Sequence, residues 1–115
     1  MAYITITPQD RPLTITAGGT RLGETRNALE LKEGSYPPVL YIPRADVDMT
    51  LLVKTTRETT CPHKGLCSYY AVKTPQGLLE NAVWSYEAPI PGMEQITGHL
   101  AFYPDKVTLA AVEKI

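Results

Sequence analysis

The segment from Thr60 to Cys67, with the sequence TCPHKGLC, concentrates more reactive side chains than any other part of the chain. Cys61, His63 and Cys67 are ligand types that Zn²⁺ accepts, and His99 could supply a fourth. The segment lacks the paired Cys-x-x-Cys spacing typical of zinc sites, and the chain has only two cysteines. We therefore expect no metal and no cofactor, and interpret both cysteines as thiols half-buried in a hairpin.

A reactive nucleophile is a second interpretation of this segment. The Lys64 amine can lower the pKa of the Cys61 thiol or act as a nucleophile itself, and His63 can serve as a base. Neighbouring residues of a strand point to opposite faces, however, so their order alone does not bring them into contact. An enzyme that uses Cys61 or Lys64 stays open as an alternative.

Aromatic side chains on two expected neighbouring strands favour a third interpretation, a ligand pocket. An aromatic wall with a few polar groups is the usual composition of a small-molecule site. Arg44 and Lys64 follow the ends of expected strands and can contact an anionic group. We therefore predict that a small anionic or aromatic ligand binds to Arg44, Lys64, Tyr70, Trp84 and Tyr86. The alternative is that these rings pair across the sheet as core.

The elements that must position these residues are short strands. Alternating apolar and polar residues, ended by Gly or Pro, predict strands at residues 3–7, 13–17, 20–22, 39–42, 66–74, 78–87, 100–103 and 106–112. Gly18 and Gly19 suit a hairpin turn. The segment 27–33 has a helix-forming composition but alternates strictly, so we predict a strand there. Single helical turns are expected at 43–47 and 93–96.

Length, composition and charge limit the domain organisation and the partners. The chain has 115 residues, 43% of them hydrophobic, with ten prolines and eight glycines, which favours a single domain over 1–115. The net charge of −1 argues against a general nucleic-acid-binding protein. No apolar run approaches the roughly 20 residues that span a bilayer. We expect a cytoplasmic protein that binds neither nucleic acid nor membrane.

Four motifs in fixed order resemble a bacterial family, domain of unknown function 427. They are YIPRADV at 41–47, CPHKG at 61–65 followed by tyrosines at 69–70, WSYEAP at 84–89 and AFY at 101–103. The resemblance spans residues 28–107 and implies a mainly β fold of the β-tent or Mss4-like type. In that fold two antiparallel sheets lean together, with one or two short helical turns. A related tent binds its ligand in an aromatic cage, which by analogy falls near Trp84 and Tyr86.

The leading prediction is a small-ligand-binding β domain with an aromatic pocket. The enzyme described above is one alternative, and a protein-interaction module with an exposed edge strand is another. The three differ in which groups must be accessible: the pocket wall, the thiol and amine, or an unpaired strand edge. The positions of Lys64, Trp84 and Tyr86 relative to one another are therefore the geometry that matters most.

Overall fold

A computed structural model describes residues 3–112 and confirms the mainly β class. The described strands are β1 Ile4–Gln9, β2 Leu13–Ala17, β3 Thr20–Thr25, β4 Ala28–Glu33, β5 Val39–Tyr41, β6 Leu52–Cys61, β7 Gly65–Thr74, β8 Gly77–Pro89, β9 Ala101–Phe102 and β10 Thr108–Ala111. The described helices are three 3₁₀ turns, η1 Arg44–Asp46, η2 Met49–Leu51 and η3 Glu94–Ile96. Within these residues no helix is long and apolar enough to cross a membrane.

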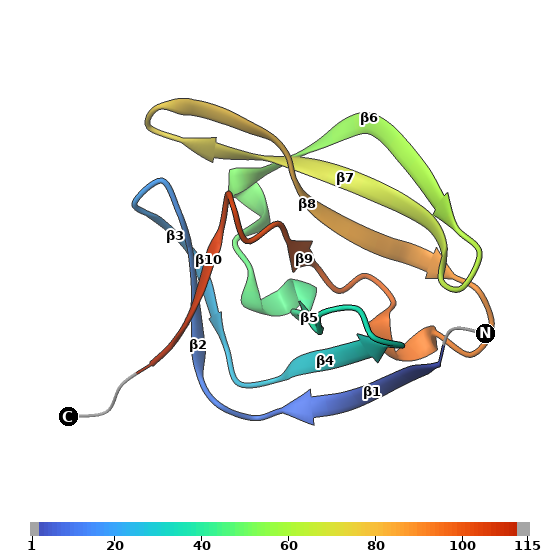
Figure 1. The fold of residues 1–115 in the computed structure, drawn as a ribbon. Coiled ribbons are helices and arrows are strands. Elements are labelled where there is room, and N and C mark those ends of the chain that lie inside the picture. Colours follow the sequence, from blue (N-terminus) through green and yellow to red (C-terminus); the bar gives the residue numbers. More distant parts are fainter. Residues whose placement is uncertain (1–2, 113–115) are drawn as a thin grey trace.

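The strands form three antiparallel sheets, with the orders β1-β4-β5, β10-β2-β3 and β6-β7-β8-β9. In Figure 1, β6, β7 and β8 lie opposite β1 and β4, β2, β3 and β10 close the side between them, and β5 and β9 lie in the interior. The resemblance implied two sheets. There are three because the ribbon formed by β1–β2 and β3–β4 bends at residues 10–12 and 26–27, and its halves enter different sheets.

Local sequence explains several of these elements. The segment 27–33 is a strand despite its helix-forming composition, because β4 is paired on both edges, and Ala28 and Leu31 are buried on its opposite faces. The β2–β3 hairpin turns at Gly18 and Gly19, whose φ angles of 55° and 80° are accessible to glycine. The expected helical turns at 43–47 and 93–96 are present as η1 and η3.

Gly23 in β3 allows an unusually close approach of two backbones. A Cβ atom at this position would lie 2.1 Å from the Asp46 carbonyl oxygen of η1. Gly23 forms a bridge with Val47, and the Asp48 N–H donates to the Leu22 carbonyl at 2.7 Å. The absence of a side chain at Gly23 thus lets β3 pair directly with the segment that carries Arg44.

The central hairpin departs from simple alternation. β6 runs from Leu52 to Cys61 and contains an irregularity between Lys54 and Glu58. Three residues of β6, Thr55 to Arg57, lie there opposite the single residue Tyr69 of β7, and the Arg57 guanidinium lies over the Tyr69 ring, 4.8 Å from its centroid. Sequence periodicity does not reveal this insertion, because two extra residues leave a period-two pattern in phase.

Two hydrophobic clusters make up the core. The larger one joins β2, β3, β7, β8 and β9 and consists of aliphatic residues with Tyr70 and Phe102. The smaller one contains Leu31, Tyr41, Cys67, Tyr69, Tyr86, Ile96 and Ala101. Because three of these seven residues are tyrosines, the smaller cluster presents aromatic surface toward the space between β4, β5 and the β7–β8 hairpin.

Candidate functional site

A pocket of about 370 Å³, hereafter the aromatic pocket, opens above the smaller core cluster. Its aromatic residues are Tyr36, Tyr41, Tyr69, Trp84, Tyr86 and Tyr103, and its other lining residues are Leu31, Glu33, Pro37, Val39, Lys64 and Cys67. Strands β4 and β5 supply one wall, β7 and β8 supply the opposite wall, and the β6–β7 turn closes one end with Lys64. A volume of this size lies within the range of small-molecule sites.

Lys64 faces into the protein. Its ammonium Nζ donates to Glu33 Oε1 at 2.6 Å and lies 5.9 Å from the Tyr86 ring centroid. The two charged side chains are only 10% and 15% exposed. The second carboxylate oxygen of Glu33 and the remaining N–H groups of Lys64 are not used in this contact. The pair can therefore offer a ligand both a hydrogen-bond acceptor and hydrogen-bond donors. The pair contributes no net charge to the pocket.

Trp84 forms the half-buried edge of the aromatic pocket. Its indole N–H donates to the Tyr41 hydroxyl oxygen at 3.3 Å, and the two rings meet edge to face with centroids 6.5 Å apart. On its other side the indole packs on Tyr103, with centroids 4.6 Å apart. Because the Tyr41 oxygen accepts this bond, its own proton remains a possible donor. Protein contacts thus fix the orientation of the indole without covering it.

Burial keeps the polar groups of the pocket floor uncharged. Desolvation raises the pKa of Tyr41 and the pKa of Tyr86 far above the ordinary value of a phenol. It also raises the pKa of the Cys67 thiol. Under neutral conditions the floor therefore presents phenols and a thiol, which donate hydrogen bonds but bear no charge.

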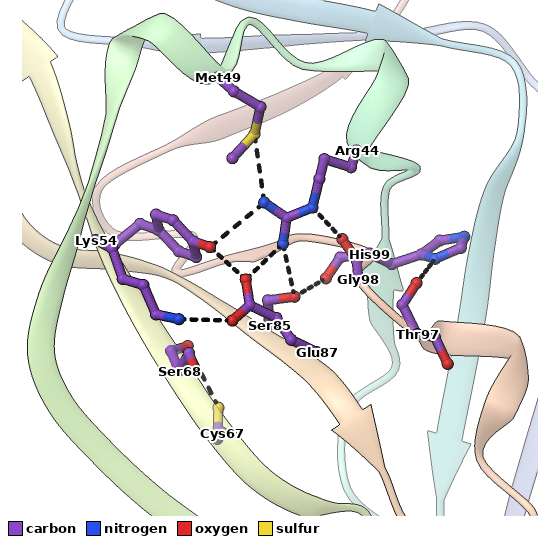
Figure 2. A network of polar contacts seen from close by, with 11 residues as sticks. Arg44, Met49, Lys54, Cys67, Ser68, Ser85, Glu87, Thr97, Gly98 and His99 are labelled. Carbon is purple, nitrogen blue, oxygen red and sulfur yellow. Dashed lines mark hydrogen bonds and ion pairs between the residues drawn. The ribbon is translucent and has the colours of Figure 1, made fainter.

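Arg44 lies outside the aromatic pocket, in a separate polar network (Figure 2). Tyr70 also lies outside the pocket and belongs to this network through its contact with Arg44. The Arg44 guanidinium donates to the Gly98 carbonyl at 3.1 Å, to the Tyr70 hydroxyl at 3.3 Å and to Glu87 Oε2 at 2.8 Å. The Tyr70 hydroxyl also donates to Glu87. Lys54 donates to the second Glu87 oxygen at 2.9 Å. These contacts use the planar fork of Arg44 to join η1 to β7, β8 and the segment before β9.

The Glu87 carboxylate is the centre of that network. Burial by itself would raise its pKa, but hydrogen bonds from Lys54 and Tyr70 and the charges of Lys54 and Arg44 outweigh this effect and lower the pKa to about 2. Glu87 is therefore ionised at neutral pH and its charge is balanced within the protein. This arrangement fits a role in stabilising the fold.

The candidate nucleophiles are poorly placed for catalysis. Lys64 Nζ contacts Glu33 Oε1 at 2.6 Å, so the amine is engaged in an ion pair and is not free to approach a substrate. Cys61 is half-buried against the smaller core cluster, and His63 is exposed in the turn. Among residues 3–112, no three His, Cys, Asp or Glu side chains gather closely enough to hold a metal ion.

Comparison with known proteins places the chain in a family. The family described as Domain of unknown function (DUF427) matches residues 5–113. The chain belongs to this family. Among curated proteins, no significant match to the sequence is found. The match extends beyond the segment 28–107 that carries the four DUF427-like motifs and includes the strands β1, β2 and β3.

The four motifs of the DUF427 resemblance meet at the aromatic pocket. Each contributes at least one lining residue, namely Tyr41, Lys64 with Tyr69, Trp84 with Tyr86, and Tyr103. Of the predicted site residues, the structure brings Lys64, Trp84 and Tyr86 together here and places Arg44 and Tyr70 in the polar network.

Sequence reasoning missed Glu33 and Tyr41 as pocket residues, and of the two adjacent tyrosines it selected Tyr70 where the pocket is lined by Tyr69. Tyr69 could have been identified from the sequence, because alternation puts Tyr69 and Tyr70 on opposite faces of the strand, and in the structure Tyr69 pairs directly opposite Trp84. Glu33 gave no such signal: it ends a strand 31 residues before Lys64, and only the packing of β4 against the β6–β7 turn brings the two together.

Proposed function

We propose that this protein binds a small, flat, uncharged ring compound in the aromatic pocket. The observation that supports this most strongly is the combination of six aromatic residues with a neutralised Lys64–Glu33 pair around one cavity of about 370 Å³. Aromatic faces favour a ring that can stack or meet them edge to face. A charged ligand would have to give up hydration in a cavity that offers it no net opposite charge.

The polar groups indicate which ring compounds fit best. Lys64 and Glu33 present donor and acceptor side by side, and Tyr41 and Tyr86 add uncharged phenols. A ring that carries an N–H next to a carbonyl, as a lactam does, can satisfy both partners of the ion pair at once. A carboxylate would compete with Glu33 for Lys64 and repel it. The neutral aromatic class is therefore favoured over the anionic one.

Three matched probes test this proposal. Carbostyril is a fused-ring lactam, naphthalene has a similar shape without polar groups, and naphthoate carries a negative charge. Trp84 is the only tryptophan, so its indole N–H resonance reports directly on the pocket. We expect carbostyril to shift this resonance and to bind at least about tenfold more tightly than naphthoate, which corresponds to about 1.4 kcal/mol.

A pair of double variants supplies the control. The exchange Lys64→Met with Glu33→Gln keeps the approximate shape of the pocket and removes both charges, so carbostyril should lose its advantage over naphthalene. The matched change Lys32→Met with Glu30→Gln removes an ion pair on the same strand that does not line the pocket, and should leave binding unchanged. Failure of all three probes to bind, or tighter binding of naphthoate, would contradict the proposal.

A further inference from the structure

A second cavity of about 480 Å³, hereafter the apolar groove, adjoins the aromatic pocket. The two share the side chains of Tyr36, Pro37, Val39 and Trp84 as walls. Beyond Trp84 the apolar groove continues over Leu40, Phe102 and Leu109. The half-buried indole therefore stands between two compartments of one extended depression.

The two compartments differ in chemistry. Among residues 3–112, no charged side chain lines the apolar groove, whereas the aromatic pocket contains Lys64 and Glu33. The indole N–H of Trp84 already bonds to Tyr41, so that donor is not available to an occupant of the groove. Pro37, Pro38 and Pro104 stiffen the rim, which reduces the entropy lost on binding. Such a surface suits saturated hydrocarbon.

We infer that the ligand is elongated, with its ring in the aromatic pocket and an alkyl chain of several carbons in the apolar groove. This inference rests on the proposed function, since the ring defines where the chain starts. Because Trp84 and Val39 line both compartments, a ring in the aromatic pocket lies next to the start of the apolar groove. The apolar groove therefore selects for chain length, and the aromatic pocket selects for the ring.

A homologous series measures this directly. Carbostyril itself and carbostyrils with methyl, butyl and heptyl chains are titrated into the full chain by calorimetry. Each methylene that enters the groove should tighten binding by about fourfold. In amide and methyl NMR spectra of the wild-type protein, only the chain-bearing ligands should shift the resonances of Leu40 and Leu109. All members of the series should shift the Trp84 indole resonance.

Two leucine variants separate the groove from general hydrophobicity. Leu109→Gln places an amide in the groove and should weaken the heptyl compound at least tenfold while leaving carbostyril unchanged. Leu78→Gln alters a leucine that is 52% exposed at the tip of the β7–β8 hairpin and should affect neither. The wild-type NMR readout decides the question even if Leu109→Gln fails to fold.

The outcomes distinguish the two proposals. Binding of carbostyril with no dependence on chain length would overturn the elongated ligand and leave the proposed function intact. Failure of every compound to shift the Trp84 resonance would overturn both. Shifts at Leu40 and Leu109 that depend on protein concentration without ligand would show that a second copy of the chain covers the groove, which also overturns the inference.

Discussion

The Lys64 ammonium and the Glu33 carboxylate lie 2.6 Å apart, although 31 residues separate them in the sequence. Both side chains are largely removed from water, with exposures of 10% and 15%. Each ion has lost hydration that only its partner replaces. The pair therefore fastens the turn between β6 and β7 to the end of β4, and it does so at the wall of the aromatic pocket.

Separate removal of either charge should be costly. Lys64→Met leaves the Glu33 carboxylate without a counter-charge and should lower the free energy of unfolding by about 3 kcal/mol. Adding Glu33→Gln should recover most of this loss, because no uncompensated ion remains. Urea unfolding of the single and double variants gives the coupling energy. Strictly additive losses would contradict a coupled pair.

The stability of the protein should depend on pH through Glu87. Its pKa of about 2 in the folded state lies below the ordinary value of 4.5, so the folded protein binds this proton less readily than the unfolded chain. The contribution of Glu87 is therefore fully present above 4.5 and is lost as the pH falls toward 2. Because the side chain is 30% exposed, solvent screening limits the effect to about 1–2 kcal/mol.

Chemical denaturation of the wild type and of Glu87→Gln between about pH 6 and about pH 2 measures this contribution. The difference in unfolding free energy between the two proteins should shrink as the pH falls. Ser85→Ala removes a group of the same network that does not titrate. Its destabilisation should stay constant over this range, and a constant difference for Glu87→Gln as well would refute the assignment.

Trp84→Ala should cost less stability than its size suggests. The indole is half-buried and touches the pocket on one face, so truncation should lower the free energy of unfolding by about 2 kcal/mol. Phe102→Ala, at a ring that is 5% exposed in the larger core cluster, should cost about 3–5 kcal/mol. Thermal or urea unfolding gives the comparison. An equal or larger loss for Trp84→Ala would mean that the indole belongs to the core.

Gly23→Ala should be strongly destabilising. The new methyl group would lie 2.1 Å from the Asp46 carbonyl oxygen, and both atoms are fixed by backbone, so β3 and η1 must separate. Overpacking of this kind costs about 1–3 kcal/mol. The neighbouring Glu24→Ala changes an exposed position and should be nearly neutral. A Gly23→Ala protein as stable as Glu24→Ala would show that this approach is not required.

Thiol labelling should separate the two cysteines. Cys67 is 2% exposed and burial raises its pKa, so in the folded state it should react much more slowly with an aromatic disulfide than the half-buried Cys61. The variants Cys61→Ala and Cys67→Ala assign each rate, and denaturant should make the two rates similar. Rapid labelling of Cys67 in the native protein would contradict its placement in the core.

Much of the fold follows from local sequence. Period-two alternation with Gly and Pro at its ends is enough to predict β4 despite its helix-forming residues, and it is enough for the β2–β3 hairpin. Alternation did not predict the division into three sheets. It depends on bends at 10–12 and 26–27, where a paired ribbon changes direction without any distinctive turn motif.

The candidate site was harder to predict than the strands, because it depends on contacts between segments that are distant in the sequence. Lys64, Trp84 and Tyr86 could be grouped because hairpin pairing places them near one another. Arg44 was grouped with them because of its charge and its position after an expected strand. In the structure its 3₁₀ turn directs the side chain toward Glu87 and Tyr70, and this direction depends on how η1 packs against β3. The direction of a side chain such as Arg44 is thus set by contacts between segments distant in the sequence.

The contacts of the Arg44 guanidinium determine how this part of the protein unfolds locally. One side chain holds η1, β8 and the carbonyl of Gly98 together, and the adjacent Ile42 and Leu100 exchange both of their backbone hydrogen bonds. These segments cannot detach one at a time without breaking the Arg44–Glu87 ion pair or the hydrogen bond to Gly98. The amide hydrogens of η1, of β8 near Glu87 and of the segment before β9 should therefore exchange with deuterium at similar rates, in one cooperative local unfolding event.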